Sequence, residues 1–496
     1  MKTILLSLLL LVLHVQTMAA DFSFNSNCTS AYSNMLQLRF AEAQKLLEKE
    51  KQINPDNLAV CYIENYIDFL RAFISEEQID FDHLKRNTDI RIEMINKADP
   101  DSPWKKYAKA EMLLHLSLAK LKWKEYLTAG YLLRKSYKLL EENQQQFPTF
   151  AVNLKGLGFF HAVIGAVPDN YTWLSNLAGM KGTISQGGNE LQLLVYKTEK
   201  DESLHFLRDE SMIIKIFVAM HFEKKQENAL LLLDKMKKNN SQSGPLQVFI
   251  EANTLMLAGQ QDKSLATLTS FQPSKDQYPL YYLNYLTGIL QLNQLDLKAD
   301  TEFTTFITNF KGRSFVKSAY HKLAWICLLK NDTTGYYKNL DRVLKNGNDF
   351  TDEDKQAQKE AVSREKPNLI LLRSRLLFDG GNYSASLTEL AGKPPSLFPS
   401  LKDQLEFTYR LARIFDKKDQ KNKAIEYYTR TFDNGQHQTW YFAANAALNN
   451  GLIYEELNKK NEAVTWFKKC LSLRNHDYQN SIDQKAEAGL NRLNTK

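Results

Sequence analysis

A glycine-rich stretch between residues 156 and 188 has the residue types that could bind a phosphate group. It holds seven of the 20 glycines of the chain, and Gly156 and Gly158 begin a G-x-G pattern. A dinucleotide-binding loop needs a third glycine and a preceding strand, and a P-loop needs Gly-Lys followed by Ser or Thr. Phe160 and His161 stand where the third glycine belongs, and no strand pattern precedes them. The stretch therefore does not predict a phosphate site.

The same stretch favours close packing between two helices. Gly158, Ala162 and Gly165 recur at helical spacing, so they would form a small-residue face that another backbone can approach. Pro168 is expected to end that helix, and Gly179 is expected to turn the chain after it. We interpret the stretch as a helical insertion, and docking of a lipid or a protein partner there stays open.

No other residues form a catalytic or metal-binding pattern. The histidines lack an H-E-x-x-H arrangement, and the four cysteines lack a C-x-x-C pair. The acidic run 349–355 lacks the glycine and the spacing of a calcium loop, and it is expected to begin a helix with Thr351 as the N-cap. We therefore expect no catalytic residue, no cofactor, no cofactor-binding residue and no metal ligand, and we predict that the protein is not an enzyme.

The four cysteines are expected to remain free thiols. Residues 35–53 have the apolar period of a single amphipathic helix, with Phe40, Ala43 and Leu47 on its buried stripe. Such a helix would hold Cys28 and Cys61 at different heights of an antiparallel pair, too far apart for a disulfide.

The composition is that of a folded helical protein. Of its 496 residues 43% are hydrophobic and 24% are charged, and 12 prolines and 20 glycines leave few breaks for turns. The net charge of +7 comes from lysines that are mixed with acidic residues. Such mixtures are typical of solvated helix faces, so we expect no nucleic-acid partner.

Internal repeats give the clearest indication of the fold. Small and large residues recur at gaps of 3, 9, 4 and 3 in two segments near the carboxyl end. The residues of this structural repeat signature are Ala412, Phe415, Ala424 and Tyr428, with Thr431 at the fifth position, followed by Gly451, Tyr454, Ala463, Phe467 and Cys470. The first three gaps recur from Ser374 to Leu390 and from Ala252 to Leu268. Small residues are needed where two antiparallel helices come closest, and such hairpins must stack to bury their remaining apolar faces.

These segments resemble the tetratricopeptide repeat (TPR), most strongly over 404–473. The resemblance implies an all-α fold, an α-solenoid of antiparallel helix hairpins that forms a right-handed superhelix. The motifs "GLGFF", "LAGMKGT" and "YYLNYLTGILQLNQLD" occur in an order similar to that of one TPR-containing family. That family includes the inclusion-body clearance proteins and tetratricopeptide repeat protein 39. This chain departs from it by an export signal, which puts the cytosolic role of those relatives in doubt here.

The first 20 residues have the pattern of a secretory signal peptide. One lysine precedes an apolar run from Ile4 to Val15, and small residues follow at Ala19 and Ala20, where cleavage is expected. The run is shorter than the about 20 residues that a membrane span needs. We predict three regions: the signal peptide 1–20, a region of degenerate hairpins 21–240 with the insertion 156–188, and a TPR-like solenoid 241–496, whose clearest repeats are 404–436 and 443–475.

The function that the sequence favours is that of an exported, nonenzymatic TPR scaffold. It would bind a protein or peptide partner within an envelope assembly, with side chains of the inner helices of each pair. Localisation would be periplasmic or cell-envelope associated in a Gram-negative bacterium and secreted otherwise, with any membrane association through a partner. A nutrient- or carbohydrate-binding protein at an outer membrane is the alternative, and an enzyme with a helical fold is the second alternative.

Overall fold

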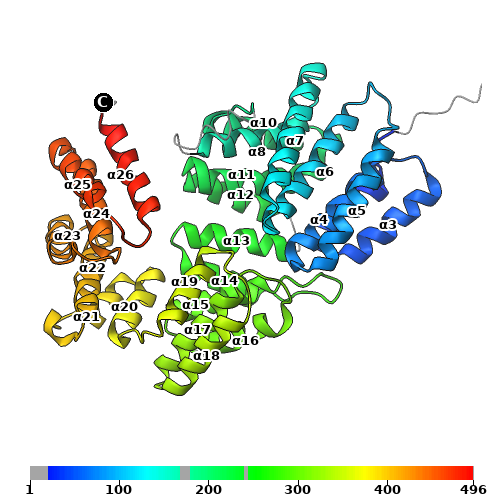
Figure 1. The fold of residues 1–496 in the computed structure, drawn as a ribbon. Helices are drawn as coiled ribbons and strands as arrows, with labels where there is room; N and C mark the ends of the chain where they lie inside the picture. Colours follow the sequence, from blue (N-terminus) through cyan, green and yellow to red (C-terminus); the bar gives the residue numbers. More distant parts are fainter. Residues whose placement is uncertain (1–20, 168–178, 240–243, 495–496) are drawn as a thin grey trace, which may run out of the picture. The chain divides into compact units, whose positions relative to one another are not determined.

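The computed structural model describes residues 21–167, 179–239 and 244–494 (Figure 1). Across these ranges the secondary structure is helical, apart from an isolated bridge between Asp21 and Asn57. The predicted all-α fold of paired helices is thereby confirmed. The predicted signal peptide 1–20 and Pro168 lie outside the described residues.

The chain divides into two compact units. Unit 1 comprises residues up to Leu283 together with Thr308–Ser314, and unit 2 comprises Asn284–Ile307 and the residues from Phe315 onward. The helices of unit 1 are α2 (Ser26–Leu36), α3 (Phe40–Ile53), α4 (Ala59–Ser75), α5 (Gln78–Ile95), α6 (Pro103–Lys122), α7 (Tyr126–Gln146), α8 (Asn153–Ala166), α10 (Ile184–Lys200), η2 (Glu202–Leu207), α11 (Arg208–Val218), η3 (Ala219–Glu223), α12 (Gln226–Asn239), α13 (Pro245–Leu257) and α14 (Gln261–Ser270). The predicted boundary between residues 240 and 241 stays a prediction.

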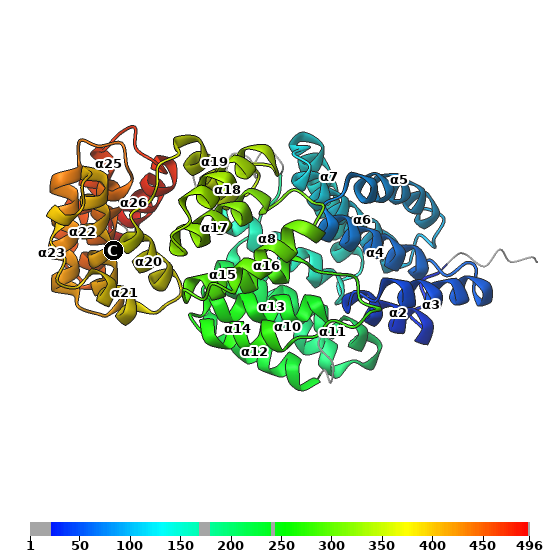
Figure 2. The ribbon, with the colours of Figure 1, turned by 90° about the horizontal axis from the view of Figure 1, so that it is seen from below.

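Unit 2 continues the pattern of hairpins. Its helices are α15 (Tyr282–Asn293), α16 (Ala299–Asn309), α17 (Val316–Leu329), α18 (Thr333–Lys345), α19 (Asp352–Ser363), α20 (Leu369–Asp379), α21 (Tyr383–Leu390), η4 (Pro395–Leu397), α22 (Leu401–Lys417), α23 (Lys421–Gly435), α24 (Phe442–Glu456), α25 (Lys460–Ser472) and α26 (Gln479–Asn494). Figures 1 and 2 show α22 to α25 stacked side by side, each in contact with the next. At α19, Thr351 accepts a hydrogen bond from the backbone N–H of Asp354, which confirms the predicted N-cap.

Small residues that are twelve positions apart bring the two helices of a hairpin together. In the α20–α21 hairpin the hydroxyls of Ser374 and Ser386 lie 2.9 Å apart, and Ser386 Oγ also donates to the carbonyl of Ser374 at 2.7 Å. In the α13–α14 hairpin Ser264 Oγ donates to the carbonyl of Ala252 at 2.8 Å. Close contact between the helices therefore requires a small side chain at both positions.

The turn inside each hairpin explains why this spacing is constant. At eight turns between described helices a left-handed residue follows the small residue by seven positions, and the next N–H bonds back to a carbonyl five residues earlier, which is the Schellman ending of a helix. These left-handed residues are Leu38, Lys124, Gly259, Leu295, Asn331, Gly381, Asp419 and Asn458. Because every such turn uses the same number of residues, the close-contact positions keep the same separation.

The glycine-rich stretch packs α8 against α10 at backbone distance. A Cβ atom on Gly187 would lie 2.3 Å from the carbonyl oxygen of Gly158 and 2.4 Å from the backbone nitrogen of Ala162. A Cβ atom on Gly165 would lie 2.3 Å from the backbone nitrogen of Ile184. The predicted small-residue face is confirmed, and Gly179 has the positive φ, +67°, of a chain turn.

The predicted single helix over residues 35–53 is wrong. Leu38 has a φ of +58°, and the chain forms α2 and α3 on its two sides. Cys28 consequently lies beside the turn after α3, with its Sγ 3.5 Å from Asn57 Nδ2, rather than far from it. The four cysteines are free as predicted, but the helix length that was expected to separate Cys28 from Cys61 is not the reason.

Candidate functional site

The residues of the structural repeat signature lie inside the hairpins. A Cβ atom on Gly451 of α24 would lie 2.5 Å from the ring of Phe467 on α25, so these two helices meet at that point. Tyr454 is half-buried. The carbonyls of Phe415 and Tyr454 accept the turn hydrogen bonds described above. The other signature residues are buried: Ala412, Phe415, Ala424, Tyr428, Ala463, Phe467 and Cys470. These positions hold the helices together, so a binding site must be sought elsewhere.

The first helices of successive hairpins in unit 2 form one continuous face. Helix α20 contacts α22, and α22 contacts α24, although a second helix separates each pair in the sequence. We call the side that these helices and α17 share the inner face. Its half-buried side chains are Lys322, Arg375, Arg413, Tyr441 and Asn445, and the ring of Trp325, which is 2% exposed, lies beneath Lys322 and Arg375.

Cations on the inner face lie over aromatic rings. The Lys322 ammonium is 3.7 Å from the centroid of the Trp325 ring, and the Arg375 guanidinium is 4.9 Å from the same centroid. The Arg413 guanidinium lies 4.1 Å from the ring centroid of Phe378. The negative face of an aromatic ring attracts a cation, so these contacts fix long side chains that would otherwise be mobile.

The charges of the inner face are only partly compensated. Glu360 of α19 lies 2.8 Å from His321 Nε2 and 3.8 Å from Arg375 Nη1. Lys322 and Arg413, in contrast, form no ion pair with any described residue. Burial and the charge of Arg375 lower the pKa of Lys322 to about 8, although Glu360, Asp379 and Glu353 act in the opposite direction. The face therefore holds cations in excess of the carboxylates that contact them.

Tyrosines extend the inner face toward the carboxyl end. The ring of Tyr441 lies 5.7 Å from that of Tyr409 and 5.6 Å from that of Tyr478, in both cases edge to face. Tyr478 is 55% exposed. Asn445, one turn along α24 from Tyr441, is half-buried. Rings and amides of this kind provide apolar contact and hydrogen bonds to an extended chain.

The sequence repeat indicates part of this face. Arg375 and Arg413 directly follow the small residues Ser374 and Ala412 of the repeat signature. That register position faces the inner side in both helices, so the repeat alone indicates these two arginines. In α17 the residue that follows the small residue Ala324 is Trp325, and Lys322 lies two positions before Ala324, so this register position does not indicate Lys322.

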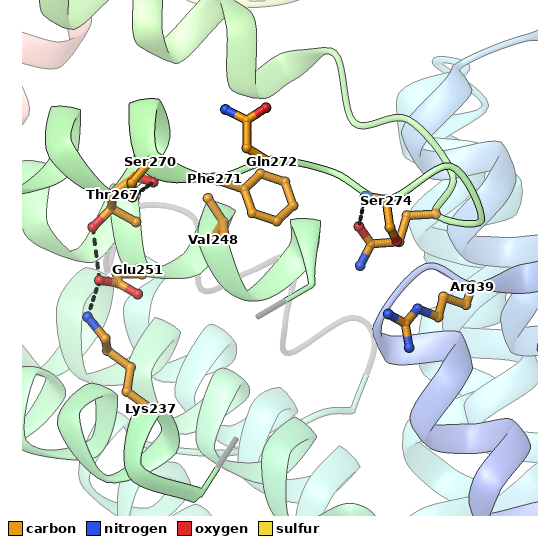
Figure 3. Close-up of a pocket in the computed structure, with 10 residues that line it drawn as sticks. Arg39, Lys237, Val248, Glu251, Thr267, Ser270, Phe271, Gln272 and Ser274 are labelled. Atoms are coloured by element: carbon orange, nitrogen blue, oxygen red, sulfur yellow. Dashed lines mark hydrogen bonds and ion pairs between the residues drawn. The ribbon is translucent and has the colours of Figure 1, made fainter. Parts of the chain in front are cut away.

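Unit 1 has a separate polar cleft of about 510 Å³ between α13, α14 and the loop that follows them (Figure 3). Glu251 accepts hydrogen bonds from Lys237 Nζ at 2.6 Å and from Thr267 Oγ1 at 2.9 Å. At the other end, Arg39 Nε lies 3.0 Å from Asp276. The charges that line this cleft are paired with each other, and it therefore offers a ligand less than the inner face does.

A buried ion cluster lies in the core of unit 1. Lys155 Nζ is 2.7 Å from Glu111 Oε2 and 2.8 Å from Glu210 Oε1. Glu210 also accepts hydrogen bonds from the hydroxyls of Tyr32 and Tyr66. All three ionisable side chains are at most 4% exposed, so no ligand reaches them and the cluster joins α2, α4, α6, α8 and α11.

The family comparison agrees with the hairpin geometry. Residues 440–477, which span α24, α25 and the loop before α26, match the tetratricopeptide repeat. The chain therefore contains a TPR. The finer resemblance to the inclusion-body clearance family rests on sequence motifs alone.

Comparisons with whole proteins add little. The apo form of the quorum sensor NprR from B. thuringiensis is 12% identical, with a TM-score of 0.29, over 82% of this chain and 97% of that chain. The Cut9–Hcn1 hetero-tetramer of the APC/C gives 12% identity and a TM-score of 0.21, over 94% of this chain and 99% of that chain. These scores are too low to inform the function. No curated protein matches the sequence. Among the described helices, none is long and apolar enough to cross a bilayer.

Proposed function

We propose that the chain is a nonenzymatic TPR scaffold that binds a polypeptide segment on the inner face of unit 2. The observation that carries this proposal is that the half-buried side chains of Lys322, Arg375, Arg413 and Tyr441 come from α17, α20, α22 and the start of α24. A face built from several repeats contacts a ligand along its length, as an extended peptide requires.

The two alternatives from the sequence have less support. A sugar-binding platform uses flat, coplanar rings, whereas the rings of Tyr441 and Tyr478 meet at 77°. An enzyme would need a perturbed carboxylate within a cleft. Burial raises the pKa of Glu111, Asp354 and Asp403, and none of these carboxylates lines the cleft of Figure 3.

Peptide selection on the full chain tests this function. A displayed peptide library is selected on the wild-type protein, and the selected peptides are measured on Tyr441→Ala, an inner-face variant. Tyr427→Ala on the second helix α23 is the matched control. We expect binding to weaken at least about tenfold in Tyr441→Ala, the loss typical of a buried aromatic contact, and to stay unchanged in the control. Equal affinities for the wild type and Tyr441→Ala would contradict the proposal.

We further propose that the protein is exported and acts in the cell envelope or outside the cell. The charged start, apolar run and small residues of segment 1–20 support this. Amino-terminal sequencing of the protein from its native host is expected to begin at Ala20 or Asp21. Recovery of a chain that retains residues 1–20 would contradict export by this route.

A further inference from the structure

We propose that an exposed face of α7 in unit 1 docks on the surface of a bilayer that contains anionic lipids. We call it the α7 face, and its side chains are Tyr126, Leu127, Tyr131, Arg134, Lys135 and Lys138. The inference goes beyond the peptide site proposed in unit 2 and does not depend on it. The contact would be direct, and it differs from the association through a partner that the sequence favours.

Apolar side chains on the first two turns of α7 are exposed to an unusual degree. Leu127 is 92% exposed, the highest value among the large apolar side chains of the described residues. Tyr131, one turn further along, is 66% exposed, and Tyr126 is also exposed. A single exposed apolar side chain is common on a protein surface, whereas three on adjacent turns of one helix indicate a contact site.

Cations continue the same side of the helix. Leu127, Tyr131, Arg134 and Lys138 follow one another at gaps of 4, 3 and 4 residues, so they lie on one face, and the buried side chains of α7 lie on the opposite side. Arg134, Lys135 and Lys138 are exposed and form no ion pair with any residue that the structure describes. The face is therefore apolar at its amino end and positively charged beyond it.

The acidic side chains near this face are engaged elsewhere. Glu125 is the single acidic residue within 124–140, and it forms an ion pair with Lys120 of α6. The next exposed carboxylate along α7 is that of Glu142, which lies 3.7 Å from Lys106 of α6. The α7 face thus has an excess of positive charge that an anionic surface would complement.

The cations of α6 and α7 also repel one another. Burial, together with the charges of Lys135 and Lys105, lowers the pKa of Lys109 on α6. Lipid phosphates along α7 would offset this repulsion, because a nearby opposite charge favours the charged form of a lysine. The attraction is expected to weaken as salt is added, since exposed charges are screened.

The composition of the α7 face fits a bilayer better than a protein partner. Lysine is depleted at the centre of protein interfaces, whereas basic residues beside tyrosine and leucine are typical of helices that lie on bilayers. A stable protein interface also takes about 800 Å² from each partner, more than three apolar side chains provide. On a bilayer, Leu127 and the tyrosine rings would enter the headgroup region while the long basic side chains reach the lipid phosphates.

Sedimentation of the full chain with lipid vesicles tests this inference. One set of vesicles contains phosphatidylglycerol and phosphatidylcholine in equal parts, and the comparison set contains phosphatidylcholine alone. We expect the protein to bind the anionic vesicles at least about tenfold more tightly at low salt, and the difference to shrink as salt is raised. No binding to the anionic vesicles, or binding that does not depend on lipid charge, would overturn the inference.

Two similarly exposed leucines test the apolar contact. Leu127→Ser is expected to weaken binding to the anionic vesicles by about tenfold, because a large apolar side chain no longer enters the headgroup region. Leu231→Ser on α12 is the matched control, since Leu231 is 67% exposed but lies one turn from the exposed acids Glu227 and Asp234. Equal affinities of the wild type and Leu127→Ser, or an equal loss in Leu231→Ser, would contradict docking through α7.

Two pairs of cations test the charge. The double variant Arg134→Gln with Lys138→Gln is expected to bind the anionic vesicles about tenfold more weakly and with a smaller dependence on salt. Lys460→Gln with Lys468→Gln, on the exposed side of α25, makes the same change in net charge and should bind as the wild type does. Residues 1–20 are present in every variant, so their contribution is the same throughout. An equal loss in both double variants would mean that net charge alone drives binding, and the α7 face would not be the docking site.

A second copy of the chain is the other occupant that these variants can reveal. Sedimentation equilibrium without vesicles measures self-association of the wild type and of Leu127→Ser. We expect both to have the same oligomeric state. Self-association that is lost in Leu127→Ser would assign the α7 face to contact between two copies, and the inference would be wrong.

Discussion

At the scale of single residues, Glu50 is a buried carboxylate that is held by four asparagines and no cation. Its Oε1 accepts from the side chains of Asn25, Asn54 and Asn57 at 2.6, 2.9 and 2.8 Å, and its Oε2 accepts from Asn27 at 2.9 Å. Burial alone would raise the pKa of Glu50, but these hydrogen bonds lower it to about 2. The ionised form therefore stabilises the turn between α3 and α4.

We expect Glu50→Gln to lower the free energy of unfolding at pH 7 by about 2 kcal/mol, because the new amide turns a donor toward the asparagine donors. The folded-state pKa of Glu50 lies below its ordinary value of 4.5, so its stabilisation is complete above that pH and is lost as the pH falls toward about 2. Urea unfolding at pH 7 and at pH 3 measures the difference. A wild-type advantage that grows on acidification would contradict this account.

Lys155 is a second residue whose environment makes a clear prediction. Burial would lower the pKa of Lys155, but Glu111 and Glu210 raise it well above its ordinary value. Lys155→Met leaves these two carboxylates buried without a cation, so we expect a loss of about 3–5 kcal/mol in unfolding free energy. In the double variant with Glu111→Gln, denaturant unfolding should show a smaller loss than the sum of the two single losses. Strict additivity would mean that the ion pair is not coupled.

At the scale of elements, the contact between α8 and α10 depends on the absence of side chains. Gly187→Ala would place a methyl group against the backbone of Gly158 and Ala162, so we expect it to lower the unfolding free energy by about 1–3 kcal/mol. Gly130→Ala is the control, because a Cβ atom there meets nothing within 4 Å and alanine favours the exposed helix α7. Thermal unfolding should show a lower Tm for the first variant and an equal or higher Tm for the second.

The hairpins were predictable from the sequence because their determinants are local. Helical periodicity and a small residue at each close contact appear directly in the repeats from Ala252 and Ser374. The break at Leu38 was missed because a leucine with positive φ carries no local turn signal. The site was less predictable for a related reason. Arg375 has a place in the repeat register, whereas its contact with the ring of Trp325 depends on packing between α17 and α20.

At the scale of the whole molecule, the chain returns to unit 1 after it has begun unit 2. Glu76 Oε2 accepts the backbone N–H groups of Arg313 and Ser314 at 2.9 and 2.8 Å, and Glu76 Oε1 pairs with Lys122 at 2.7 Å. These contacts attach the returning segment to the end of α4. A carboxylate that accepts backbone N–H groups in a buried site is strongly favoured over an amide there.

We expect Glu76→Gln to speed hydrogen exchange at the amides of Arg313 and Ser314, because one acceptor oxygen is replaced by a donor. Gln78→Ala is the control. It removes exposed side-chain contacts with Arg313 Nη2, Trp123 Nε1 and Asp82 and none with the backbone of residues 313 and 314, so exchange at these amides should change little. Exchange that is equally fast in both variants, or unchanged in Glu76→Gln, would show that Glu76 does not hold this segment.

The return of residues 308–314 also constrains the order of events during synthesis. Domains of a nascent chain generally fold from the amino end as they leave the ribosome. Here residues 308–314, the last segment of unit 1, emerge only after residues 284–307, which belong to unit 2. Unit 1 can therefore complete its packing against residues 308–314 only after the first residues of unit 2 have been translated.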